Sequence, residues 1–254
     1  MTENRPKAII SDIHSNLEAL TAVLADIEKR GIKEILCLGD IIGYGPNPRE
    51  CIDQAKSFKI TILGNHDEAA IWSDQTESFN PVAKDAVDWT RRMLEDPKDS
   101  FRNTKRWDFL GELQRSYREN SELYVHGSPR KPVREYVFPE DIANRGKMED
   151  IFGRIEHVCY IGHSHMPGVF TEDMTFRPPQ EFFNQYEVNG KKTIINVGSV
   201  GQPRDGDNRA CYIVVNGTRV EYVRVQYDFE ETIKKIYAVK ELDNFLADRL
   251  AEGR

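Results

Sequence analysis

The chain has 254 residues, of which 39% are hydrophobic and 30% charged, so a packed core is expected and disorder is not. Its formal net charge of −7 argues against a stable nucleic-acid partner held by bulk electrostatics. The four cysteines are scattered without CxxC spacing, which argues against a zinc finger or a disulfide framework and favours buried thiols.

No membrane segment is predicted. The opening stretch MTENRPKAII has no long apolar run behind its charges, which is unlike a signal peptide. Elsewhere no stretch approaches the roughly 18 apolar residues that a membrane span needs. We therefore expect a cytoplasmic protein without a membrane partner.

The first quarter of the chain alternates short apolar runs with helical patterns. The run at 8–10 predicts a strand, and leucines at helical spacing predict a helix after it that ends at Gly31. Ser15 and Glu18 have the spacing of a capping box for this helix. EILCL and KITIL predict two further strands, with a helix between them that starts at Asn47-Pro48. This order predicts parallel strands covered by helices.

Residues 68–120 interrupt this order with two helical patterns, one from Pro81 and one that contains Trp107 and Leu110. The insertion is either a cap over the strand ends or an extra helical layer, and the sequence does not choose between these interpretations.

The later part of the chain is richer in predicted strands. ELYV and HVCYI predict strands on either side of a helix around 148–152. EVNGKK and IVVNGTRVEYV each contain Asn-Gly, which predicts two hairpins, and a helical pattern with Leu242, Phe245, Leu246 and Leu250 on one side closes the chain. No repeat or linker interrupts the pattern, so we expect one domain over 1–254 with two sheets.

Polar clusters recur directly after the apolar runs, where strands are expected to end. They read SDIH, GD, GNHD, HG, GHSH and NVGS along the chain. Binding crevices of open α/β sheets lie outside the carboxyl ends of the strands. Five of the six histidines fall in these clusters, all except His157, and they alternate with carboxylates and an asparagine. Such mixed nitrogen and oxygen ligands suit Mn, Fe, Zn or Ni, and their number exceeds the needs of one ion.

The ordered clusters resemble the motifs of the calcineurin-like metallophosphoesterase superfamily, and NVGSVGQPRDG resembles a segment of a bacterial phosphodiesterase-like branch of it. The resemblance implies a four-layer αββα sandwich of the α/β class with two mixed sheets. It also implies two metal ions about 3.5–4 Å apart, as in two-metal hydrolases generally. Carried over by motif, Asp12, His14, Asp40 and His165 would bind the first ion, and Asp40, Asn65, His126 and His163 the second.

The resemblance further implies hydrolysis of a phosphate ester by a water that the metals activate. His66 is not needed as a ligand in this scheme, so we expect it to protonate the leaving group. Asp67 beside it either orients the imidazole or caps a helix that starts at Glu68, and both interpretations stay open. Arg204, Tyr44 and Arg130 are weaker candidates for substrate contacts, since each is also a reasonable loop residue.

A phosphodiesterase or broad phosphatase acting on small or nucleotide-like substrates fits this sequence best. Protein serine/threonine phosphatases of the superfamily carry GDxxDRG and usually GNHE, where this chain has GDIIGYG and GNHD. Diadenosine-polyphosphate hydrolases tend to have an arginine near the same place, which GDIIGYG lacks. Both assignments are therefore weakened and are kept as alternatives. A scaffold module of the same fold is the non-enzyme alternative. The sequence leaves metal identity, substrate and oligomeric state open.

Overall fold

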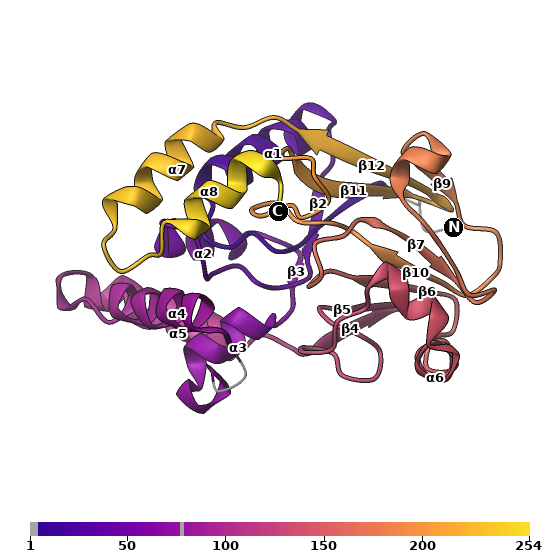
Figure 1. Cartoon of the computed structure of the whole chain (residues 1–254), viewed down its shortest axis with the longest axis horizontal. Helices are drawn as coiled ribbons and strands as arrows, with labels where there is room; N and C mark the ends of the chain where they lie inside the picture. The colour runs from indigo at the N-terminus through magenta and orange to yellow at the C-terminus, as the bar shows by residue number, and fades with distance from the viewer. Residues whose placement is uncertain (1–4, 77–78) are drawn as a thin grey trace.

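Two six-stranded sheets form the centre of the molecule in the computed structural model, which describes residues 5–76 and 79–254 (Figure 1). The first sheet has the order β3 (Ile60–Thr61), β2 (Glu34–Cys37), β1 (Lys7–Ile10), β11 (Ala210–Asn216), β12 (Arg219–Val225), β9 (Gln185–Glu187). The second has the order β4 (Ser116–Glu119), β5 (Glu122–Val125), β6 (Val158–Ile161), β10 (Thr193–Asn196), β7 (Gly168–Thr171), β8 (Thr175–Arg177). Both sheets are mixed: β1–β2–β3 and β5–β6–β10 run parallel, and the other pairs are antiparallel.

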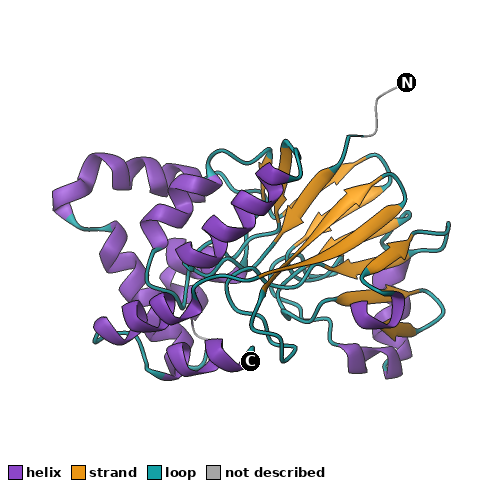
Figure 2. Cartoon of the chain, turned by 90° about the horizontal axis from the view of Figure 1, so that it is seen from above, coloured by secondary structure: helices purple, strands orange, loops and turns teal. Residues whose placement is uncertain are grey.

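Helices cover the outer faces of both sheets, and most of them lie on the side of the first (Figures 1 and 2). On that side are α1 (Leu17–Lys29), α2 (Pro48–Ala55), α3 (Asn65–Ile71), α4 (Pro81–Leu94), α5 (Ser100–Gly111), α7 (Phe229–Ala238) and α8 (Phe245–Glu252). The second sheet is covered by α6 (Arg145–Gly153). Short 3-10 helices occupy Ser73–Thr76, Pro97–Asp99, Pro139–Ala143 and Pro179–Phe182.

Three hydrophobic cores fill the spaces between these layers. Alternate residues of β1 point to opposite faces of the sheet, as the period of two in a strand requires: Ala8 and Ile10 pack with the helices, and Ile9 packs between the sheets. A third core lies between the second sheet and α6, around Met148 and Phe170. The predicted αββα sandwich with two mixed sheets is therefore confirmed. All four cysteines are buried free thiols.

No helix in the described ranges is long and apolar enough to cross a membrane.

Three local predictions need correction. The N-cap of α1 is Asn16 rather than Ser15, which has a left-handed φ of 55°. The Asn16 side chain accepts a hydrogen bond from the Ala19 amide at 3.1 Å. The hairpin predicted in EVNGKK does not form, since β9 and β10 lie in different sheets, whereas the Asn216-Gly217 hairpin joins β11 and β12 as predicted. Phe245 is 51% exposed rather than on the buried side of α8.

Candidate metal centre

The seven predicted metal ligands meet at one edge of the sandwich and are all buried. Each follows a parallel strand: Asp12 comes after β1, Asp40 after β2 and His126 directly after β5. His163 and His165 follow β6, and Asn65 is the first residue of α3, after β3. The carboxyl ends of parallel strands share an edge, which explains why clusters so distant in sequence converge.

The first group of side chains surrounds His14. Its Nε2 lies 3.1 Å from His165 Nε2 and 3.6 Å from Asp40 Oδ2. His165 Nε2 is in turn 3.2 Å from Asp12 Oδ1. The ligand atoms of Asp12, His14 and His165 lie within 4.8 Å of one another, and Asp40 adds a second carboxylate beside His14.

The second group surrounds His126. Its Nε2 lies 3.0 Å from Asn65 Oδ1, 3.1 Å from His163 Nδ1 and 3.4 Å from Asp40 Oδ2. The same Asp40 oxygen therefore contacts both groups. A carboxylate oxygen shared in this way is suited to a position between two cations, because its charge offsets their repulsion.

The other ring nitrogen of each of these four histidines faces a backbone carbonyl oxygen. His14 Nδ1 lies 3.2 Å from the oxygen of Ile42, His126 Nδ1 2.9 Å from that of Leu38, His163 Nε2 3.2 Å from that of Arg134, and His165 Nδ1 2.5 Å from that of Gln202. A carbonyl only accepts, so the N–H of each neutral ring is placed there, and the nitrogen that faces the groups presents a lone pair. This is the arrangement found around histidines that bind metals.

The protonation states of three of the four rings agree with this arrangement. Burial lowers the pKa of His14, His163 and His165, which keeps these rings in the neutral form that binds a cation. His126 differs: despite its burial, the adjacent Asp40 raises the pKa of His126 to about 9. The space between His126 and Asp40 therefore favours a positive charge. These donor atoms fit the site for two metal ions that the sequence predicts.

The backbone is strained at this edge. Asp12, His14, Asp40, His163 and His165 all have left-handed φ between 49° and 64°. Residues with side chains rarely adopt this conformation, at a cost of roughly 1–2 kcal/mol each. Hydrogen bonds hold the loops in place; for example, Asn196 Nδ2 donates to the Gly162 carbonyl and to Ser164 Oγ.

The His66 ring lies beside the first group, and its Nδ1 has no hydrogen-bond partner among the described residues. Its ring centroid is 4.4 Å from that of Tyr44 and 4.8 Å from that of Phe79, and its buried Nδ1 contacts no donor or acceptor in the described residues. A His66 nitrogen lies within 4.8 Å of ligand atoms of His14 and Asp40. Burial lowers the pKa of His66 to about 4. His66 is thus held by packing next to the ligands, where it is available to a substrate.

Gly43 makes the position of His66 possible. It has a φ of +93°, and a Cβ added to it would lie 2.4 Å from His66 Nδ1. For the phosphate-ester hydrolysis that the sequence predicts, Gly43→Ala is expected to lower turnover of alkyl esters at least tenfold, because the imidazole must move. Gly31→Ala is the matched control: Gly31 has a φ of +71° but no atom within 4 Å of the added Cβ. Both variants should lose about 1–2 kcal/mol of stability, and equal turnover in the two would contradict this role.

Asp67 contacts backbone amides rather than His66. Its carboxylate accepts from the amides of Asp40 (2.8 Å), Ile41 (3.0 Å), Ile42 (3.3 Å) and Gly64 (3.1 Å). Asp67 stands in the first turn of α3, which begins at Asn65 with Gly64 as its N-cap. It is therefore not the N-cap of a helix starting at Glu68, but its side chain caps the Gly64 amide from within the first turn. The structure brings Asp67 to the loop that carries Asp40, and gives it no hydrogen bond to the His66 ring.

The three weaker candidates differ in position. Tyr44 lies over the rings of His14 and His66 and lines a pocket beside them. The Arg204 guanidinium is 5.9 Å from the Tyr44 ring and donates to Gln202 Oε1 at 2.7 Å. Arg130 is not brought to the site, because its guanidinium pairs with Glu135 and with Asp150 on α6.

The pocket at this edge encloses about 250 Å³ and contains residues that sequence reasoning missed. Four of the residues that line it were predicted for the site: Tyr44, Asn65, His66 and His163. The others are Phe79, Asn80, Ala83, Arg134 and Tyr136. Phe79, Asn80 and Ala83 come from the 68–120 insertion, so part of it borders the site. Its role as a cap stays a prediction. Arg134 and Tyr136 follow the HG cluster within ten residues, which is the one signal that pointed to them.

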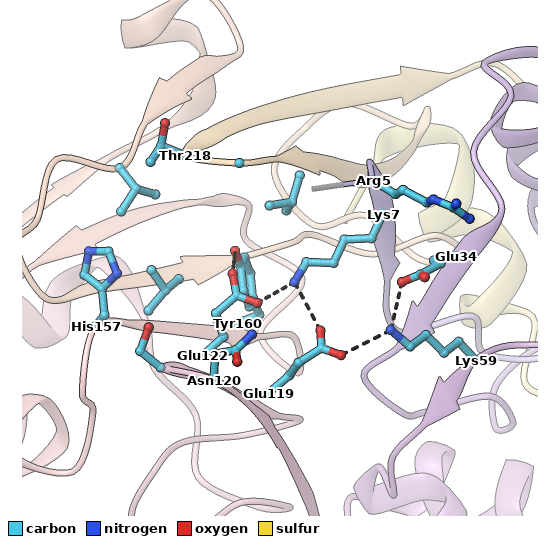
Figure 3. Close-up of a pocket in the computed structure, with 15 residues that line it drawn as sticks. Arg5, Lys7, Glu34, Lys59, Glu119, Asn120, Glu122, His157, Tyr160 and Thr218 are labelled. Carbon is cyan, nitrogen blue, oxygen red and sulfur yellow. Dashed lines mark hydrogen bonds and ion pairs between the residues drawn. The ribbon is translucent and has the colours of Figure 1, made fainter. Parts of the chain in front are cut away.

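A larger cavity of about 680 Å³ lies at the opposite end of the sheets, where β1, β2 and β5 begin (Figure 3). Its charged groups bind one another: Lys7 pairs with Glu119 and Glu122, and Lys59 pairs with Glu34 and Glu119. These side chains are 12–37% exposed, so the pairs lie at a partly solvated surface, and no residue of the metal centre lines this cavity.

Comparisons with known proteins agree with this geometry. Residues 7–218 match the model of the calcineurin-like phosphoesterase superfamily domain. An uncharacterised protein of Methanocaldococcus jannaschii is 38% identical over 255 residues, covering 97% of this chain and 98% of the relative.

Solved structures also match over nearly the whole length. A metallophosphoesterase from Sphaerobacter thermophilus has a TM-score of 0.82 at 35% identity, covering 98% of this chain and 99% of that one. A hypothetical protein from Pyrococcus horikoshii has the same fold, with a TM-score of 0.77 at 20% identity and 98% of each chain covered. The chain is thus a member of the calcineurin-like phosphoesterase superfamily.

Proposed function

We propose that this chain is a phosphoesterase with two metal ions that hydrolyses the phosphate ester of a small, nucleotide-like substrate. The observation that carries the proposal is the pair of His and carboxylate groups that share Asp40 Oδ2, at 3.6 Å from His14 and 3.4 Å from His126. A single structural ion would not need a second set of ligands on the other side of that oxygen.

In this proposal one ion is held by Asp12, His14, Asp40 and His165, and the other by Asp40, Asn65, His126 and His163. When bound, the ions supply an acidified water and positive charge for the phosphate oxygens. Mn, Fe, Zn and Ni all suit the nitrogen and oxygen donors.

His66 gives a proton to the leaving oxygen in its imidazolium form, which the negative charge of a bound phosphate favours over the neutral ring that burial alone favours. Its place is fixed by its own amide, which donates to Asp40 Oδ1 at 2.8 Å, and by the rings of Tyr44 and Phe79 on its sides. The carboxylate that accepts from the His66 amide therefore belongs to Asp40, the residue shared by both groups of ligands. Tyr44 and Arg204 are candidates for holding the substrate beside it.

The pocket supports a small substrate with a planar apolar part. Tyr44, Phe79 and Tyr136 form much of its wall, and the Tyr136 ring stacks on His163 with centroids 3.6 Å apart. Its volume of about 250 Å³ is slightly below the range of roughly 300–1,000 Å³ typical of ligand pockets, which suits part of a mononucleotide. Aromatic side chains bind nucleobases by stacking, at about 1–3 kcal/mol per base.

The test compares adenosine 5′-monophosphate with ribose 5-phosphate, two esters that share their leaving oxygen and differ by the base. With added Mn²⁺, wild-type kcat/KM should be higher for the nucleotide. Phe79→Ala should lower it about tenfold more for the nucleotide than for ribose 5-phosphate, because the loss of Phe79 packing on His66 affects both esters alike. Phe101→Ala, 72% exposed on α5, should change neither. Equal values for both esters would refute the nucleotide-like substrate. Failure to hydrolyse these and p-nitrophenyl esters with any of the four metals would refute the enzyme.

A further inference from the structure

Arg134 is one of the residues that line the pocket, and two side chains hold its guanidinium. Its Nε donates to Glu68 Oε2 at 2.6 Å and its Nη2 donates to Gln75 Oε1. Its Nη1 has no hydrogen-bond partner within residues 5–76 and 79–254. The backbone oxygen of the same residue lies 3.2 Å from His163 Nε2, so Arg134 is tied to the metal centre through its main chain.

Glu68 fixes this guanidinium. It is 2% exposed and lies three residues after Asn65 on α3. A buried carboxylate is costly unless it is paired, and Glu68 pairs with two arginines: Arg134 and, at 2.7 Å, Arg115 Nη2. The Arg115 side chain is 59% exposed and does not line the pocket. Glu68 therefore connects one arginine at the surface with one at the site.

We propose that Arg134 binds an anionic oxygen of the substrate phosphate and that Glu68 is its positioning residue. Arginine is suited to this task because its planar donors match phosphate oxygens and its charge is permanent. With Nε and Nη2 committed to Glu68 and Gln75, the side chain is oriented before a ligand arrives and Nη1 remains for the ligand. The inference rests on the proposed function, since it assigns the phosphate of that same substrate.

The experiment uses inorganic phosphate as the probe, first as an inhibitor of p-nitrophenyl phosphate hydrolysis by the Mn²⁺-loaded protein. Arg134→Gln should raise the inhibition constant of phosphate and KM at least tenfold, with unchanged metal content. Arg115→Gln removes the other partner of Glu68 and should change both by less than twofold. Glu68→Gln should raise the inhibition constant severalfold although Arg134 is intact, and Arg134→Lys should restore only part of the affinity.

Calorimetric titration with phosphate measures the same affinities without turnover. If hydrolysis fails, the proposed enzyme is refuted, and the role of Arg134 is still decided by the phosphate affinities. Thermal unfolding of each variant identifies loss of the fold, and Arg134→Lys then serves as the measured variant if Arg134→Gln unfolds. Equal phosphate affinity in wild type, Arg134→Gln and Arg115→Gln, or an equal loss in both variants, would show that Arg134 is only a structural ion-pair partner.

Discussion

Replacing Asp40 by alanine is expected to reduce the bound metal below two ions per chain and to lower kcat/KM by more than about 100-fold. Loss of a group that only orients a metal ligand typically costs 10–100-fold, and Asp40 lies between both groups of ligands. The same change removes the acceptor of the His66 amide. Metal content by mass spectrometry and hydrolysis of p-nitrophenyl phosphate measure the two effects.

Two controls separate charge from shape. Asp40→Asn keeps an oxygen acceptor for the His66 amide but removes the negative charge, so it should bind more metal than the alanine variant and less than wild type. Asp26→Ala removes a carboxylate on α1 that pairs with Arg30, far from the ligands, and should leave metal content unchanged. An Asp40→Ala protein that still holds two ions with wild-type affinity would rule out the shared carboxylate.

His66→Gln should keep both metals and slow hydrolysis in proportion to the difficulty of the leaving group. A positioned general acid contributes about 10²–10⁴-fold, so kcat for an alkyl ester such as ribose 5-phosphate should fall by that factor. A p-nitrophenyl leaving group needs no proton, so its rate should fall less than tenfold. His66 lies within 4.8 Å of His14 and Asp40 ligand atoms, so metal content must be measured alongside the rates.

Loss of one ion in His66→Gln would instead assign His66 to the metal ligands. His157→Gln provides the control, because His157 is the histidine that follows no strand end and lines the distant cavity. An equal fall in rate for alkyl and p-nitrophenyl esters, with metals retained, would contradict proton donation.

The convergence of the candidate ligands was predictable from sequence because their positions depend on local information, whereas their assignment to two ions rests on the family resemblance and stays a prediction. A polar cluster after each apolar run is visible in the chain, and parallel strands bring their carboxyl ends together. The features that were missed depend on contacts between distant segments. Arg134 stands within ten residues of the HG cluster, but its ion pair with Glu68, 66 positions earlier, is not readable from the chain.

One incorrect hairpin prediction and the open choice at Asp67 have the same physical origin. Asn-Gly at 189–190 signals a turn but carries no information on the partner of each strand, and here the chain passes from one sheet to the other. Asp67 stands next to His66 in sequence, yet the first turn of α3 directs its carboxylate to the amides of 40–42. Adjacency along the chain is a poor guide to which polar groups meet.

The anchoring of four imidazoles by main-chain carbonyls has a consequence for how such a site can diversify. A carbonyl is present whatever the side chain, so residues 38, 42, 134 and 202 can vary without releasing the rings they hold. At 134 and 202 the side chain has a separate task, with Arg134 in the pocket wall and Gln202 holding Arg204. Side chains near the pocket can therefore change at these two positions while the main-chain carbonyls continue to hold the histidine rings.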